Sequence, residues 1–267
     1  MAPKNKIVIV TDCKDIAYNE IRGVIISELE KIDATARVDV EPPVFAKEFS
    51  LINGAFLVRL IAECYAPENT IILGILNPLK TNRGDRARII GETLNGVKFV
   101  GENTGLFSWL INDLGIKEIF ESSRAGIDGA EFISFGGKYV HAPIAAQIAA
   151  GTPLSKIGAY FDKSRITNLD IKPGTVLHID NFGVLKIYGQ LYDTSDGQEV
   201  DLLLNSRKVH DALYTNSMKN LPDGTWALYK GSSLNNLPEI GIVRNTNTAK
   251  IIGAEIGDLI TWEPKLV

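Results

Sequence analysis

The feature that most constrains the fold is a series of apolar runs separated by segments with helical periodicity. Residues 7–10 and 70–76 are almost entirely aliphatic, as in strands buried on both faces of a parallel sheet. A shorter run at 36–40 is a further strand candidate. Residues 16–32 and 49–64, which lie between these runs, carry apolar side chains at helical spacing. This β-α-β-α-β order predicts a parallel sheet with covering helices.

The pattern loosens after the third strand. Residues 86–100 contain the turn pair Asn95-Gly96 and predict a hairpin. We expect a helix at 105–114 and a strand at 116–120. An Ala-rich helix is expected at 141–150, where Gly151 is placed to end it.

The composition changes around Pro173-Gly174, a pair that breaks regular structure. Short β-rich runs separated by turn residues follow, at 175–179, 184–188, 199–204, 225–229, 239–243 and 259–262. The sequence therefore predicts an α/β domain over residues 1–171, with a mostly parallel sheet flanked by helices. A small all-β domain is expected over residues 172–267.

Composition narrows the classes of function. Hydrophobic residues make up 45% of the 267 residues and charged residues 22%, which is typical of a globular protein with a sizeable core. The net charge of −4, without a basic patch, argues against nucleic-acid binding. The two cysteines, Cys13 and Cys64, show no spacing typical of a disulfide framework or a zinc site. With no signal-like or membrane-length apolar stretch, we expect a cytoplasmic protein.

Polar residues that follow the expected strands are candidates for a site. Asp12 ends the first strand, at the sheet edge where ligands bind in open α/β sheets. It could hold the hydroxyls of a ribose or could cap the following helix. The loop from Asn77 to Arg83 follows the third strand at the same edge, and could line a site or be an ordinary surface loop.

Two further segments leave similar alternatives open. Phe135-Gly136-Gly137 precedes a helix and could let a backbone approach a ligand, or could be a plain turn. Asp180 and Phe182 could bind an amine and a flat ring, or could form a tight turn in which the Asp bonds its own backbone. The three histidines share no metal-ligand spacing, and we expect no metal site.

Several of these segments form an ordered series of motifs. The motifs are Thr11-Asp12 with Ile21-Arg22-Gly23-Val24-Ile25, residues 67–83, residues 100–106, residues 134–146, Ile179-Asp180-Asn181-Phe182-Gly183, Gly231-Ser232-Ser233, Glu239-Ile240 and residues 249–258. In this order they resemble the S-adenosylmethionine hydroxide adenosyltransferases, whose relatives include fluorinase and chlorinase. The resemblance covers most of the chain and includes the two-domain layout.

The resemblance implies roles for individual residues. Asp12 would hold the ribose hydroxyls, Asp180 the methionine ammonium, and Phe182 the adenine ring. The other residues implied to bind substrate are Phe135, Tyr214 as a second aromatic, Ser232 or Ser233 at the methionine end, and Arg244 and Asn245 at the adenine edge. The residues at the family's catalytic positions are Asn77, Arg83, Gly136 and Gly137. S-adenosylmethionine would be a substrate with no further cofactor, and a homotrimer with sites between subunits is expected.

The departures from the family pattern concern the activation of water. The family's Asp reads Asn77 in a loop one residue shorter, and its His reads Gly136. The following Arg-Asp pair reads Lys138-Tyr139, and an Asn that contacts adenine reads Val184. Asn77 cannot accept a proton as a carboxylate does, and Gly136 has no side chain.

We therefore weigh several functions. The first is attack of water on the ribose C5′ of S-adenosylmethionine, giving adenosine and L-methionine. A positioned base contributes about 10²–10⁴-fold to such a reaction. Halide transfer of the chlorinase type needs no base and is an alternative. A non-catalytic binder of S-adenosylmethionine, or a relative that binds another nucleoside, completes the set.

Overall fold

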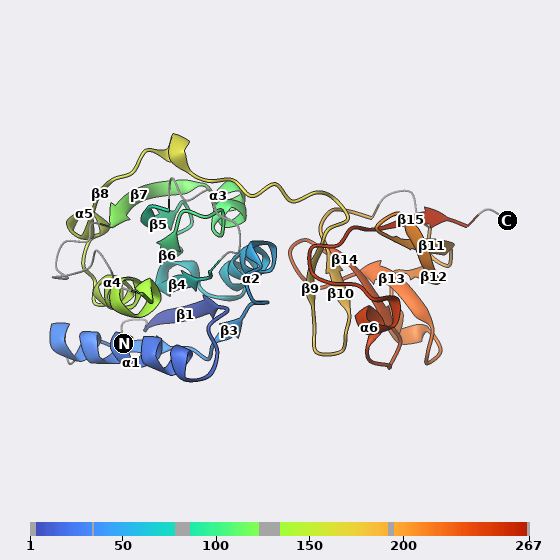
Figure 1. Ribbon diagram of the computed structural model, residues 1–267, viewed down its shortest axis with the longest axis horizontal. Coiled ribbons are helices and arrows are strands. Elements are labelled where there is room, and N and C mark those ends of the chain that lie inside the picture. The colour runs from blue at the N-terminus through green and yellow to red at the C-terminus, as the bar shows by residue number, and fades with distance from the viewer. Residues whose placement is uncertain (1–3, 34, 78–85, 123–133, 192–194, 266–267) are drawn as a thin grey trace. The chain divides into compact units, whose positions relative to one another are not determined.

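The computed structural model describes residues 4–33, 35–77, 86–122, 134–191 and 195–265. The chain divides into two compact units, residues 1–169 and 170–267 (Figure 1). The first unit combines a sheet with helices and the second is built on a curled sheet, which confirms the predicted fold class.

Within the described residues, eight strands form the sheet of the first unit. Seven follow one another in the order β2-β1-β4-β6-β5-β7-β8, and β3 pairs with β1. The strands are β1 (Asn5–Thr11), β2 (Val38–Val40), β3 (Val44–Phe45), β4 (Thr70–Ile75), β5 (Arg88–Thr93), β6 (Lys98–Glu102), β7 (Ile116–Ser122) and β8 (Gly158–Tyr160). β1, β2, β3, β4 and β6 pair in parallel, whereas β5, β7 and β8 join by antiparallel pairing.

Two layers of helices cover this sheet. The helical elements are α1 (Asp15–Ile32), α2 (Leu51–Cys64), η1 (Pro67–Asn69), α3 (Ser108–Leu114), η4 (Gly137–His141), α4 (Ala142–Ala149), α5 (Leu154–Ile157) and η5 (Lys163–Arg165). The apolar stripe of α1, formed by Ile21, Ile25 and Leu29, packs with α4 and with β1 and β4 in one core cluster. On the other face of β4, Gly74 lies against Leu106 and Phe107, which directly precede α3.

Most elements of this unit lie where the apolar pattern predicts them. The hairpin at Asn95-Gly96 is confirmed: Gly96 takes φ 102° and its N–H donates to Thr93 O over 3.0 Å. The helix expected at 105–114 begins only at Ser108, because Gly105 holds φ 95° in the preceding turn. The helix expected at 141–150 is preceded by a π-helical turn, η4, and Gly151 follows α4 with φ 89°.

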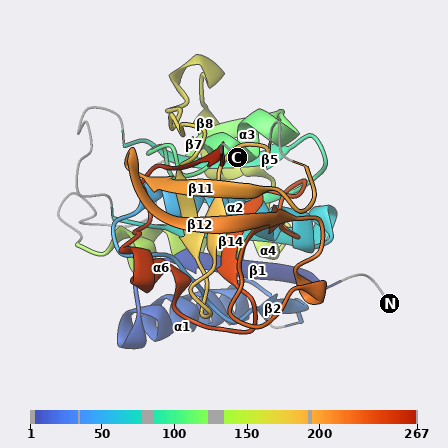
Figure 2. The same cartoon turned by 90° about the vertical axis from the view of Figure 1, so that its right-hand side faces the viewer.

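The second unit forms a seven-stranded sheet within the described residues, in the order β15-β11-β12-β13-β14-β10-β9. Figure 2 looks onto β11 and β12 of this sheet. Its elements are β9 (Val176–Ile179), β10 (Leu185–Ile187), β11 (Glu199–Leu204), β12 (Arg207–Thr215), η6 (Met218–Asn220), β13 (Trp226–Lys230), β14 (Pro238–Ile242), α6 (Thr248–Ile252) and β15 (Ile260–Pro264). The sequence did not predict β12, whose first half carries charged side chains. Leu185, Leu202 and Leu228 are fully buried in the core of the second unit.

Among the described residues, no helix combines the length and the apolar character needed to cross a membrane.

Candidate functional site

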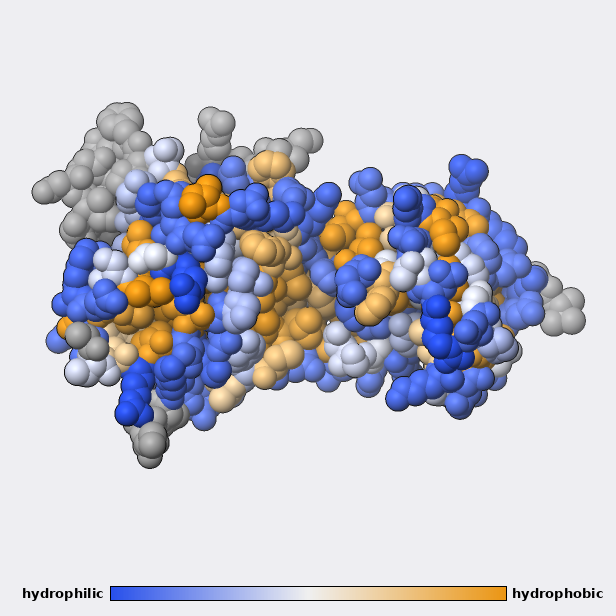
Figure 3. All heavy atoms as spheres, turned by 90° about the horizontal axis from the view of Figure 1, so that it is seen from below, coloured by the Kyte–Doolittle hydropathy of each residue, from blue (hydrophilic) through white to orange (hydrophobic). Residues whose placement is uncertain are grey.

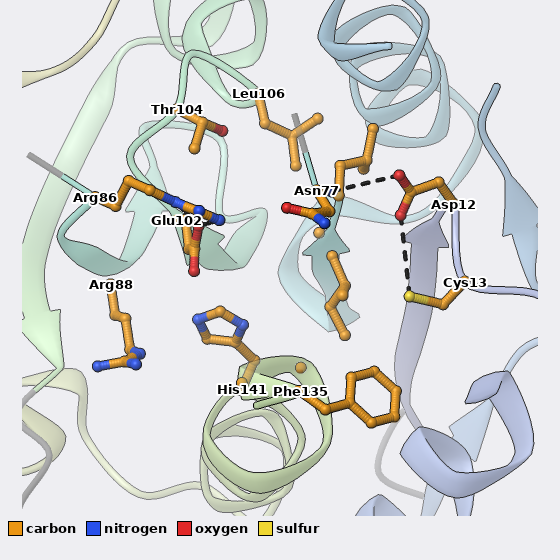
Figure 4. A pocket seen from close by; sticks show the side chains of 15 residues that line it. Asp12, Cys13, Asn77, Arg86, Arg88, Glu102, Thr104, Leu106, Phe135 and His141 are labelled. Carbon is orange, nitrogen blue, oxygen red and sulfur yellow. Dashed lines mark hydrogen bonds and ion pairs between the residues drawn. The ribbon is translucent and has the colours of Figure 1, made fainter. Parts of the chain in front are cut away.

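A pocket of about 420 Å³ opens at the carboxyl ends of β1 and β4, within the first unit (Figure 4). Its lining residues are Asp12, Cys13, Gly74, Ile75, Leu76, Asn77, Arg86, Arg88, Glu102, Thr104, Leu106, Phe135, Gly136, Gly137 and His141. The carboxyl ends of neighbouring parallel strands meet at one edge of a sheet, which brings Asp12 and Asn77 together. The volume is in the range of pockets that bind small molecules.

Asp12 is anchored by backbone amides and does not cap the next helix. Its Oδ2 accepts from Phe49 N over 3.0 Å and from Asn77 N over 3.3 Å. Helix α1 has its N-cap at Lys14, which makes no side-chain capping bond. The helix-cap alternative is therefore wrong. The other carboxylate oxygen, Asp12 Oδ1, lies in the pocket lining and contacts the Cys13 thiol at 3.9 Å.

Two bulky residues, one bound to this carboxylate and one in the pocket lining, adopt left-handed backbone conformations. Phe49, whose amide binds Asp12, has φ 60°, and Phe135 has φ 72°. Such conformations are costly for residues with large side chains and persist where the surroundings enforce them, often at functional sites. At Phe49 the enforcing contact includes the bond to Asp12.

The Gly136-Gly137 pair lies at the start of a π-helical turn that faces the pocket. An ideal Cβ on Gly137 would lie 2.8 Å from Ile75 Cγ2, so the turn packs directly on β4. Gly136 has open space around the corresponding position. π-helical turns within helices are rare and frequently accompany functional sites.

Replacing Gly137 with Ala should lower the free energy of unfolding by about 1–3 kcal/mol, because the added methyl overpacks against Ile75. Gly136→Ala is the matched control: nothing lies within 4 Å of its added Cβ, and its backbone is helical at φ −54° and ψ −27°. For that variant we expect a change within about 0.5 kcal/mol, or a slight gain. Denaturant unfolding measures both, and equal losses would contradict the packing described.

The opposite end of the pocket is rich in nitrogen (Figure 4). Arg86 Nε donates to Glu102 Oε2 over 2.6 Å. Arg88 follows two residues later, as the first residue of β5. His141 is buried, and neither ring nitrogen has a hydrogen-bond partner among the described residues. Burial lowers the pKa of His141 to about 4, and the guanidinium groups of Arg88 and Arg86 act in the same direction. The imidazole is therefore neutral at neutral pH.

Two other titratable side chains near the pocket are poor candidates for chemistry. Burial raises the pKa of the Cys13 thiol, which keeps it protonated and weakly nucleophilic at neutral pH. Lys138, at the position of the family's Arg, turns toward α1, where its Nζ binds Glu20 Oε1 over 2.6 Å. The hydrogen bond to Glu20 raises the pKa of Lys138. Lys138 therefore serves to attach η4 to α1.

The remaining predicted residues belong to the second unit. The turn interpretation of Asp180 is supported, because its Oδ1 accepts from Phe182 N and Val184 N, both over 2.9 Å. The Phe182 ring is 55% exposed, whereas Tyr214 is buried in the core, so its ring is not displayed for stacking. The segment that follows Arg244 and Asn245 packs against the Asp180 turn, since Asn247 N donates to Phe182 O over 2.9 Å.

The predicted residues thus separate into two groups. Asp12, Asn77, Phe135, Gly136 and Gly137 share the pocket of the first unit. Asp180, Phe182, Ser232, Ser233, Arg244 and Asn245 lie in the second unit, where Ser233 is buried and Ser232 is exposed. Arg83 lies outside the described residues.

Sequence reasoning missed the nitrogen-rich end of the pocket, formed by Arg86, Arg88, Glu102 and His141. The spacing of Arg86 and Arg88 carried a signal, because residues two apart in an extended segment point to the same face. No group of three or more metal-ligating side chains is found among the residues that the structure describes.

Comparison with known proteins identifies a family whose model matches more than half of this chain. Residues 7–158 match the N-terminal domain of the SAM hydroxide adenosyltransferases, SAM being S-adenosylmethionine. An (R)-S-adenosyl-L-methionine hydrolase from Methanocaldococcus jannaschii is 29% identical over 181 residues. The match covers 66% of this chain and 64% of that relative, so it spans a little under two thirds of the relative's length.

Two solved structures share the fold. An uncharacterized conserved protein from Thermotoga maritima superposes with a TM-score of 0.78 at 19% identity, over 96% of this chain and 100% of that one. A conserved hypothetical protein from Thermus thermophilus gives a TM-score of 0.72 at 19% identity, over 97% and 100% of the two chains. At this level of identity the likeness concerns the architecture alone.

Proposed function

Because the chain belongs to the S-adenosylmethionine hydroxide adenosyltransferase family, we propose that it cleaves S-adenosylmethionine by attack of water on the ribose C5′. The products are adenosine and L-methionine. The family match and the likeness to a hydrolase of this substrate support the proposal.

The observation that carries the proposal is the placement of Asp12. One carboxylate oxygen is fixed by two backbone amides, and the other is left toward a pocket of about 420 Å³. A carboxylate held in this way can accept hydrogen bonds from a vicinal diol without reorganising. In the proposed complex Asp12 therefore accepts hydrogen bonds from the ribose hydroxyls, which orients C5′ toward the rest of the pocket.

The chemistry demands little help for the leaving group. Methionine departs as a neutral thioether, so no acid is needed, and the attacking oxygen must lie about 3–3.5 Å from C5′, opposite the sulfur. The Asn77 side chain and the Gly136-Gly137 turn line the pocket from two sides and could confine a water there. Arg83 remains a predicted contributor to this site.

Product analysis tests this function. Purified protein incubated with S-adenosylmethionine should release adenosine and methionine in equal amounts, resolved by chromatography, with or without added chloride. A halogenated nucleoside formed in place of adenosine would instead indicate halide transfer, and the absence of any new nucleoside at high protein concentration would refute cleavage.

The second unit supplies the other substrate contacts in this proposal. Asp180 would bind the methionine ammonium and Phe182 would cover the adenine, with Ser232 or Ser233, Arg244 and Asn245 nearby. In the expected homotrimer, the β-rich unit of a neighbouring subunit would bring these residues to the pocket. We place the reaction in the cytoplasm, which the two free cysteines support.

Exposed apolar surface beside the pocket favours an assembly of this kind. Phe45 and Phe49, which flank the Asp12 strand end, are 42% and 45% exposed. Apolar residues also gather on the face of the first unit seen in Figure 3. Exposed clusters of this type are typical of interaction surfaces. We expect a homotrimer, and sedimentation equilibrium should give about three times the chain mass of 29.2 kDa; a monomer at micromolar concentration would contradict it.

A further inference from the structure

His141 is a buried imidazole that makes no hydrogen bond among the described residues. The side chain is 3% exposed, and both Nδ1 and Nε2 lack a partner there. Figure 4 shows its ring projecting from η4 into the pocket, between Arg88 and Phe135. A neutral imidazole carries one donor and one acceptor, and buried polar groups are nearly always paired. This group therefore calls for a ligand that supplies the missing partner.

The groups around His141 are already engaged or are cationic. Glu102, from β6, is held by Arg86. On the α1 side, Glu20 is held by Lys138. Asp12, at the far end of the pocket, has one oxygen committed to two backbone amides.

Three further groups complete these surroundings. Arg88, from β5, projects its guanidinium into the same pocket, and its Nε is buried without a partner among the described residues. Cys13 is a protonated thiol. Tyr139, in the turn before His141, is 44% exposed and lies under the Lys138 ammonium. Among the described pocket side chains, the imidazole is thus an uncharged proton acceptor, and neither of its buried nitrogens is hydrogen-bonded.

His141 also lies in an unusual backbone conformation. Residues Gly137–His141 form a π-helical turn, and α4 starts at the next residue. The extra residue in such a turn rotates the side chains that precede it relative to the following helix. In this protein His141, the last residue of the turn, lines the pocket, while Ala142 and Ala145 lie in the core.

We propose that His141 accepts the proton of the attacking water in the hydrolysis of S-adenosylmethionine, an inference that rests on the proposed function. As the water oxygen forms its bond to C5′, the C5′–S bond breaks and its electron pair leaves with methionine. One O–H bond of the water breaks, and its proton goes to the imidazole nitrogen that carries no hydrogen. The imidazolium then releases that proton to solvent, which restores the neutral ring.

Arg88 and Arg86 fit this role. Both guanidinium groups disfavour a charged imidazole, so His141 is neutral and ready to accept a proton throughout the neutral pH range. They also stabilise the hydroxide-like oxygen that develops during attack. After transfer, the same repulsion speeds loss of the proton to solvent. A weak base is sufficient because the water becomes strongly acidic as its bond to carbon forms.

The test compares His141→Phe with wild type in steady-state adenosine formation. Phenylalanine fills a similar volume and cannot accept a proton, so we expect kcat to fall by about 10²–10⁴-fold while KM changes little. His210→Phe is the matched control, since His210 stacks on Trp226 in the second unit; its rate should equal that of wild type. His141→Gln provides a second replacement, and circular dichroism verifies that each variant is folded.

The pH profile gives a readout that a packing role would not move. Wild-type kcat should not depend on pH near pH 7, and should fall tenfold per pH unit once His141 becomes protonated in acid. The residual rate of folded His141→Phe should lack that inflection. Full activity in His141→Phe, or an unchanged inflection, overturns this inference and leaves the hydrolase function standing. Wild-type protein that forms no adenosine overturns both. If neither variant folds, a wild-type rate that stays level well below pH 4 overturns the inference.

Discussion

Asp12→Asn should weaken binding of S-adenosylmethionine on the order of 10- to 100-fold, because a hydrogen bond to a charged group contributes about 1.5–3 kcal/mol. Asparagine keeps an oxygen that can accept from the amides of Phe49 and Asn77, so the loops around it should stay in place. Its NH₂ group replaces the oxygen that is left toward the pocket and cannot accept from a ribose hydroxyl. Calorimetry with S-adenosylmethionine measures the loss.

Two comparisons separate ligand binding from loop anchoring. Asp12→Ala removes the anchoring oxygen as well and should also lower thermal stability, which Asp12→Asn should not. A ribose analogue without the 2′-hydroxyl should bind wild type more weakly than adenosine, while Asp12→Asn should discriminate less between the two. If Asp12→Asn binds both ligands as wild type does, Asp12 only anchors Phe49 and Asn77, and the proposed ribose site is wrong.

Protonation of His141 in acid should lower the free energy of unfolding of the first unit by a total of about 3 kcal/mol. Burial lowers its pKa from 6.5 to about 4, so the unfolded chain binds a proton in this range that the folded chain does not. Stability therefore rises with pH between these values: the contribution is fully present above about pH 6.5 and is lost as the pH falls toward 4. About 2 kcal/mol should be lost between pH 7 and pH 5.

His141→Phe provides the reference for this measurement, because it removes the titrating group while other acidic groups continue to titrate. Since the chain has two units, hydrogen exchange at the amides of β1 and β4 should be followed, which reports on the first unit alone. The difference between wild type and variant should change by about 2 kcal/mol from pH 7 to pH 5. A difference that does not depend on pH would show that the imidazole is not buried as a neutral group.

Strand positions and the first anchor of the site could be predicted because they depend on short-range patterns. Ile7, Ile9 and Leu73 are fully buried, and their apolar runs predict central strands. Asp12 could be singled out because the carboxyl end of a parallel strand is where ligands bind. Asn95-Gly96 predicts its hairpin from turn chemistry alone.

Features that depend on long-range packing could not be predicted. Strand β12 (Arg207–Thr215) begins with exposed charged residues and is buried only toward its end, so its apolar alternation is weak. A regular helix beginning at His141 would have put this residue in an ordinary first turn. Instead His141 ends a π-helical turn whose first residue, Gly137, packs against Ile75 of β4, and a single sequence does not reveal this long-range contact.

The predicted binding residues of the second unit differ in how far their side chains are exposed. Asp180 forms the turn that its own side chain predicts, and this local role does not prevent its second oxygen from binding an amine. The family resemblance implies Tyr214 as an aromatic contact, yet its side chain lies in the core of the β-rich unit with 4% exposure. An exposed ring such as Phe182 therefore remains the better candidate for covering a base.

Turnover in water enriched in oxygen-18 tests the proposed reaction most directly. If water attacks C5′, mass spectrometry should find the heavy isotope in the 5′-hydroxyl of adenosine, with methionine unlabelled. A labelled methionine carboxylate, methylthioadenosine as the main product, or adenosine without the label would show that the C5′–S bond is not broken by solvent water in this pocket.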